Sequence, residues 1–77
     1  MLFREEVKKH YGDIGLASVV GCGIDRLTEE QREYFTEDQM HKVIQHYSDN
    51  KQEFDKMSTL SEQREVIKQY CEKEFHL

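Results

Sequence analysis

Residues 12–24 read GDIGLASVVGCGI and contain all 4 glycines of the 77-residue chain. Between Asp13 and Asp25 this segment has no charged residue, although charged residues make up 35% of the chain. An apolar, glycine-rich segment inside a charged chain is typical of the packing centre of a small protein. We therefore expect the amphipathic segments on either side to pack against it.

The spacing within this segment fits two secondary structures. Leu16, Ala17, Val20 and Gly21 follow an i, i+1, i+4, i+5 pattern that suits one buried helical face. The β-branched pair 19–20 suits a short buried strand equally well. A lone strand would leave its backbone unpaired, so we favour a helix over residues 13–20 that ends at Gly21. The residues themselves leave helix and strand both open for 16–22.

The flanking segments carry helix signals. Residues 1–11 place apolar side chains on one face, Gly12 suits a C-terminal cap, and Asp13 suits the next N-cap. Threonine precedes Glu or Gln by three residues in three capping-box patterns, at 28–31, 36–39 and 59–62. The clearest amphipathic stripe follows the second box and consists of Met40, Val43, Ile44 and Tyr47.

A brief helical piece is expected at 51–57, and a last helix runs from Leu60 to about Phe75. These signals predict an all-α fold, with residues 1–77 forming a single domain of four to five short helices. The small residue Ala17 and the expected turn at Gly21 also match the spacing of a helix-turn-helix-like unit at residues 13–35.

Composition limits the classes of function. The net charge of −5 opposes binding to phosphate, and no apolar run is long enough to span a membrane. The N-terminus lacks the apolar core of a signal peptide, so we expect a cytoplasmic protein. Cys22 and Cys71 are then expected to be reduced, although a single disulfide stays open as the alternative.

The most polarised segment is 25–38, which holds six acidic and two basic residues, a net charge of −4. Spaced carboxylates can imitate the phosphates of a nucleic acid and occupy a basic protein surface. The same acidic residues also suit the first turns of two capped helices. The expected partner-binding residues are Asp25, Glu29, Glu30, Glu33, Tyr34, Glu37 and Asp38.

Metal binding and catalysis have weaker support. His41 and His46 are five residues apart, as are Cys71 and His76, which places each pair on nearly opposite sides of a helix. His10 and Cys22 have no close ligand partner in the sequence. No phosphate-binding glycine motif is present. We expect no metal site, no cofactor and no enzymatic activity.

Our first hypothesis is a small acidic regulator or inhibitor, similar in size to phage or mobile-element proteins, that docks on a basic nucleic-acid-handling protein. One alternative is a helix-turn-helix DNA-binding regulator that reads bases with Arg26, Thr28 and Arg32 and contacts phosphates with Arg4, Lys8 and Lys9. A further alternative is a structural subunit that forms a homodimer through the last helix.

Overall fold

The computed structural model describes residues 2–77, and Met1, which the sequence places in the first helix, lies outside them. Within this range the chain forms helices and turns without a β-strand, which confirms the all-α fold. The elements are α1 (Phe3–Tyr11), α2 (Ile14–Leu16), η1 (Ala17–Gly21), α3 (Cys22–Ile24), α4 (Glu29–Glu33), α5 (Glu37–Asp49), α6 (Lys51–Asp55) and α7 (Leu60–Glu74).

The glycine-rich segment is one continuous helix over residues 14–24. Helix α2 passes without a break into η1, a π-helical turn, and then into α3. This settles the choice between helix and strand at 16–22 in favour of helix. The expectation that the helix ends at Gly21 is wrong, because Gly21 lies inside the helix and is buried.

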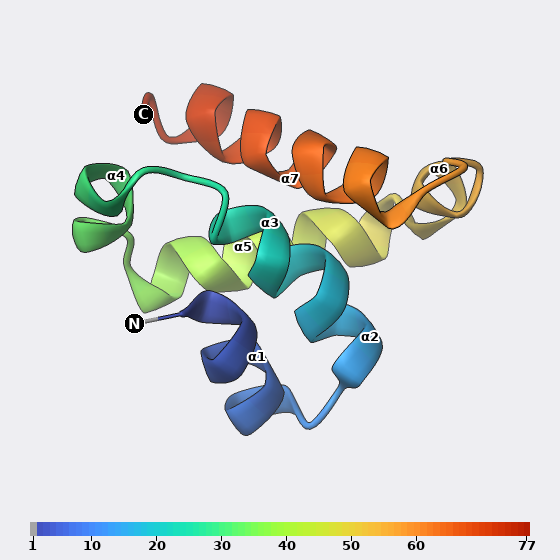
Figure 1. Ribbon diagram of the computed structural model, residues 1–77, viewed down its shortest axis with the longest axis horizontal. Coiled ribbons are helices and arrows are strands. Elements are labelled where there is room, and N and C mark those ends of the chain that lie inside the picture. The colour runs from blue at the N-terminus through green and yellow to red at the C-terminus, as the bar shows by residue number, and fades with distance from the viewer. Residues whose placement is uncertain (1) are drawn as a thin grey trace.

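The glycines allow neighbouring helices to approach this central helix closely. A Cβ atom on Gly21 would overlap the backbone of Arg4 in α1, and a Cβ on Gly23 would lie 2.6 Å from two side-chain atoms of Ile67 in α7. Figure 1 shows the central helix between α1 and α7. Residues 14–24 are therefore the packing centre that their composition indicates.

The helix-turn-helix unit expected at 13–35 does not have the predicted form. Its turn was placed at Gly21, whereas the chain turns at 25–28, after α3. The helix that follows this turn, α4, begins at Glu29 and has only 5 residues. The closeness of α1, rather than a chain reversal, explains the glycine at position 21.

The local cap signals are confirmed. Gly12 ends α1 in a left-handed conformation with φ of 63°, and the Asp13 side chain accepts a hydrogen bond from the Leu16 amide. Both boxes at 28–31 and 36–39 form with reciprocal hydrogen bonds. At the third site the Thr59 hydroxyl accepts from the amide of Glu62.

One core joins all the long helices. Three of the four stripe residues of α5 are buried, with Ile44 partly buried, and α7 contributes Ile67 and Cys71. Leu60, at the start of α7, is 48% exposed and lies outside this core. The core also includes Phe3 and Phe35, whose rings meet edge to face at a centroid distance of 5.1 Å. This aromatic pair positions α1 next to the segment that carries the acidic residues.

Candidate protein-binding surface

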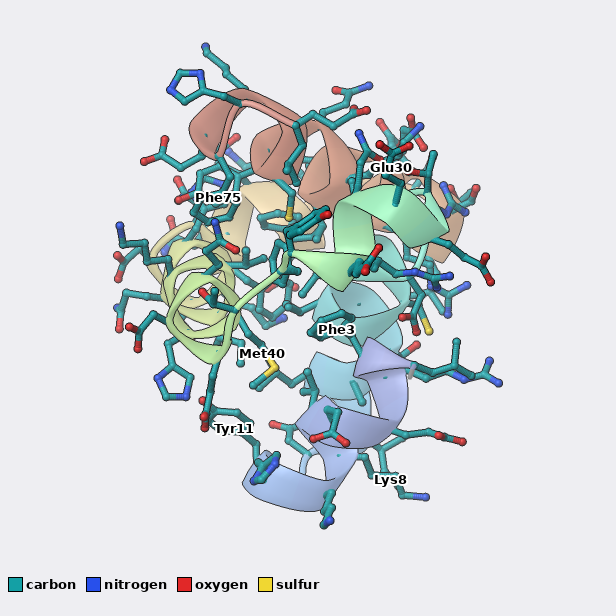
Figure 2. The ribbon with its side chains drawn as sticks, turned by 90° about the vertical axis from the view of Figure 1, so that its left-hand side faces the viewer. Phe3, Lys8, Tyr11, Glu30, Met40 and Phe75 are labelled. Carbon is teal, nitrogen blue, oxygen red and sulfur yellow. The ribbon has the colours of Figure 1, made fainter. Side chains whose placement is uncertain are left out.

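Two successive helix starts place the acidic residues outside. The capping boxes of Thr28 and Thr36 fix where α4 and α5 begin, so the acidic residues that follow occupy the first turns, where the helix dipole favours negative charge. Figure 2 shows Glu30 on the outer side of α4, away from Phe3. The side chains that remain exposed are those of Glu29, Glu30, Glu33, Tyr34, Glu37 and Asp38, here called the acidic surface.

Asp25 does not belong to this exposed set. Its carboxylate accepts hydrogen bonds from the amides of Phe3, at 2.7 Å, and Arg4, at 3.1 Å. Leu2 precedes α1 and provides no side-chain cap, so Asp25 supplies the cap from 22 residues away in the sequence. Its side chain is only 13% exposed. The position of Asp25 therefore suits a structural role.

The two arginines of the acidic segment contact other parts of the fold. Arg32 lies 3.7 Å from the Asp25 carboxylate and donates to the Asp25 backbone carbonyl at 3.3 Å. Arg26 donates to the carbonyl and hydroxyl of Ser61 and to Glu65, which all lie on α7. Both positive charges of the segment are thus used in holding the fold together.

As a result, the acidic surface is almost free of compensating charge. Glu37 approaches His41 at 3.9 Å, an ion pair only when the histidine is protonated. Over residues 2–77 no ion pair involves the other carboxylates of the surface, which belong to Glu29, Glu30, Glu33 and Asp38. The electrostatic field in front of α4 and the start of α5 is therefore strongly negative.

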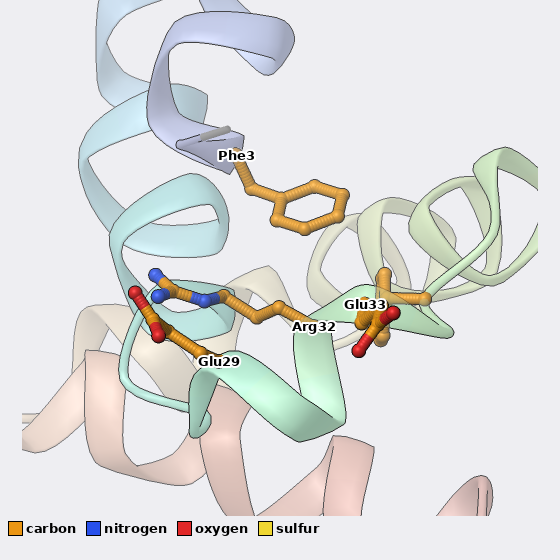
Figure 3. Close-up of a pocket in the computed structure, with 5 residues that line it drawn as sticks. Phe3, Glu29, Arg32 and Glu33 are labelled. Atoms are coloured by element: carbon orange, nitrogen blue, oxygen red, sulfur yellow. The ribbon is translucent and has the colours of Figure 1, made fainter.

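Two open pockets adjoin this surface and share Phe3 and Phe35 in their linings; together they are called the aromatic groove. The larger, of about 430 Å³, is also lined by Glu29, Arg32 and Glu33. Figure 3 shows Arg32 crossing it below Phe3, between the two glutamates. The smaller has a volume of about 190 Å³. Its other lining residues are two further glutamates, Glu6 and Glu37, together with His10 and Met40.

Tyr34 ends α4 beside the groove and is 72% exposed, one of the most exposed large side chains of the protein. An aromatic side chain in this state covers a large area on contact with a partner and loses little conformational entropy. Six of the seven predicted partner-binding residues are thus exposed, on α4, at its end and in the first turn of α5. Phe3, Phe35 and Glu6 were missed, because nothing in their local spacing shows that α1 lies next to α4.

The base-reading residues of the DNA-binding alternative are each engaged by contacts within the fold. The Thr28 hydroxyl accepts a hydrogen bond from the Gln31 amide in the capping box. The guanidinium of Arg32 contacts Asp25, and that of Arg26 contacts α7. Lys8, expected on phosphate, extends outward from α1 (Figure 2). Helix α4 is too short to present several side chains to a DNA groove.

The histidines and cysteines weighed as metal ligands are dispersed. His10 contacts Glu6 at 3.1 Å, and His46 stacks on Tyr70 with a centroid distance of 3.8 Å. Cys71 is fully buried, and burial raises the pKa of its thiol to about 12. Among residues 2–77, no three His, Cys, Asp or Glu side chains group as a metal site would require.

Comparisons of the chain with protein-family models, with curated proteins and with solved structures found no match. None of the helices in the described part of the chain is long and apolar enough to cross a lipid bilayer. Function must therefore be argued from the geometry and charge of the surface itself.

Proposed function

We propose that this protein is a small regulator or inhibitor that binds another protein through the acidic surface and the aromatic groove. The observation that carries the proposal is that contacts within the fold engage the guanidinium groups of both Arg26 and Arg32. Because these cations contact α7 and Asp25, the carboxylates outside have no arginine to neutralise them. A surface of this charge attracts a basic protein surface and steers its approach.

The aromatic groove fits basic side chains in particular. Phe3 and Phe35 are buried at the base of the groove, so a lysine or arginine would bind mainly through its charged end, at the glutamates of the rim. Arg32 does not cancel this attraction, because Asp25 already balances its charge. Tyr34 supplies an exposed aromatic anchor next to the same groove.

A nucleic-acid-handling protein is the partner class that this chemistry favours, because its own surface presents Lys and Arg to phosphate. The carboxylates of α4 and α5 would then occupy the place of phosphates, as in a protein that mimics DNA. We also propose a cytoplasmic location, a reducing compartment in which Cys22 and Cys71 would stay free thiols.

Affinity purification with the tagged protein, followed by mass spectrometry, identifies the partner. The test is then direct binding of the purified partner to the parent and to the double variant Glu30→Lys/Glu33→Lys at two salt concentrations. We expect the double variant to weaken binding by at least about tenfold, and the parent's affinity to fall as salt rises.

The matched control is Glu53→Lys/Glu74→Lys, which makes the same change in net charge at exposed positions on α6 and α7. Its affinity should stay close to that of the parent. Equal losses in both double variants would show that net charge alone matters, and the acidic surface would then have no specific role. Binding that persists in Glu30→Lys/Glu33→Lys at high salt would rule the proposal out.

A further inference from the structure

A further open pocket, of about 300 Å³, gathers three arginines from three different parts of the fold. Arg4 comes from α1, Arg26 from the turn after α3, and Arg64 from α7. The other lining residues are Leu2, Cys22 and Asp25. This arginine pocket shares no residue with the aromatic groove. The sequence alone does not bring Arg64 near the other two, because it lies about half of the chain away from Arg26 and farther from Arg4.

Other contacts hold the pocket's backbone and two of its guanidinium groups in place. Arg64 donates from Nε to the carbonyl of Ser18 at 2.7 Å and from Nη2 to its hydroxyl at 3.0 Å. Arg26 is held by Ser61 and Glu65. The backbone of Arg4 is fixed between Gly21 and the carboxylate of Asp25. Such support lowers the entropy cost of binding a ligand.

The pocket retains donors for a ligand. An arginine side chain has five N–H donors. Arg64 uses two of them on Ser18, and the side chain of Arg4 makes no hydrogen bond or ion pair with residues 2–77. The carboxylate of Asp25 faces the α1 amides and Arg32, so its charge is already balanced.

The charge balance indicates which ligand fits. Arg26 is paired with Glu65 at 3.2 Å and Asp25 with Arg32 at 3.7 Å, so neither pair contributes net charge. Arg4 and Arg64 remain without an acidic partner in the described residues, which leaves two positive charges. A phosphate monoester carries about −1.5 to −2 at neutral pH and matches the fork of a guanidinium.

We propose that the arginine pocket binds a phosphate monoester dianion, either as free phosphate or as a phosphorylated side chain of a partner. This site is independent of the proposed role of the acidic surface, because the two share no residue and attract ligands of opposite charge. A protein with both sites would engage basic and phosphorylated groups at separate places.

Cys22 provides a built-in probe of the pocket. It is partly exposed and lines the arginine pocket, whereas Cys71 is 0% exposed, so iodoacetamide should alkylate Cys22 alone in the folded protein. The experiment measures the alkylation rate by mass spectrometry while sodium phosphate replaces sodium chloride at constant ionic strength. We expect the rate to fall with a saturable dependence on phosphate.

Two variants separate specific binding from charge screening. Arg4→Gln should raise the half-protecting phosphate concentration by about tenfold, the factor expected for one lost charge-assisted hydrogen bond. Lys42→Gln removes the same charge from an exposed position on α5 and should change the half-protecting phosphate concentration by less than about twofold. If Arg4→Gln does not fold by circular dichroism, Arg64→Lys serves instead, because it keeps the charge and loses the fork.

The last arms identify the source of the phosphate. A phosphoserine peptide should protect Cys22 at lower concentration than its unphosphorylated form. Absence of saturable protection, or equal shifts in Arg4→Gln and Lys42→Gln, would overturn the proposal. An oligonucleotide that protects at a lower phosphate concentration than inorganic phosphate would also overturn it, in favour of a site for a phosphodiester chain.

Discussion

Gly21 of η1 lies directly against Arg4 of α1, so that a Cβ atom at position 21 would overlap the Cα of Arg4. Helix α1 therefore packs on the central helix at a separation that only glycine permits. The same contact fixes the N-terminal end of α1, where Phe3 borders the aromatic groove and Arg4 borders the arginine pocket. One glycine thus sets the geometry of both candidate sites.

We predict that Gly21→Ala lowers the free energy of unfolding by about 1–3 kcal/mol through overpacking. This loss should appear although alanine is the better helix former by about 1 kcal/mol. Urea unfolding followed by circular dichroism measures the effect. Gly15→Ala is the control, because Gly15 is exposed and meets only the Asp13 side chain, at 3.3 Å. A Gly21→Ala variant as stable as Gly15→Ala would contradict the close packing.

The position of Gly21 at a helix crossing, and not in a turn, could not be predicted from its neighbours in the sequence. The caps at Gly12, Asp13, Thr28 and Thr36 could be predicted because each depends on residues within four positions of one another. The role of Gly21 depends instead on which helix crosses it, a relation that the local sequence does not contain. A glycine in a turn and a glycine at a helix crossing have the same local signature.

We predict that Asp25 contributes to stability and not to partner binding. Asp25→Ala removes a carboxylate that caps α1 with two hydrogen bonds, so it should lower the free energy of unfolding by about 1–2 kcal/mol. Glu30→Ala, a change at an exposed position, should stay within about 0.5 kcal/mol of the parent. Thermal or urea unfolding measures the free energy of unfolding of both variants. Equal values would mean that the Asp25 cap does not contribute to stability.

The sequence predicted the parts of the candidate site that depend on local signals, but not those that depend on contacts between distant helices. The exposed carboxylates of α4 and α5 follow from local capping signals, and six of the seven residues named from sequence are exposed. Asp25 belongs to the same acidic segment, but the two amides that it caps are more than 20 residues away. The aromatic groove also depends on the tertiary contact between Phe3 and Phe35, which no short-range pattern indicates.

We predict that the protein loses stability at high pH through Cys71. Burial, and secondarily Glu72, raises the pKa of this thiol from 9.0 to about 12, so the folded state keeps a proton that the unfolded state releases. The stabilisation is complete below about pH 9 and is lost as pH rises toward 12, with a slope of about 1.4 kcal/mol per pH unit. Urea midpoints at pH 8, 9 and 10 measure it. The stability of Cys71→Ala should decline less steeply with pH than that of the parent. Identical slopes in the two proteins would show that Cys71 does not cause the decline.

We predict that Tyr34 acts in binding without a role in stability. Its side chain is 72% exposed and lies outside the core cluster, so Tyr34→Ala should leave the free energy of unfolding within about 0.5 kcal/mol of the parent. An aromatic anchor at an interface contributes about 2 kcal/mol or more, so the same change should weaken the purified partner's affinity by about thirtyfold. Tyr11→Ala, at a tyrosine 40% exposed at the end of α1, is the matched control and should retain affinity. If Tyr34→Ala binds as tightly as Tyr11→Ala, the contact made by the acidic surface does not include the end of α4.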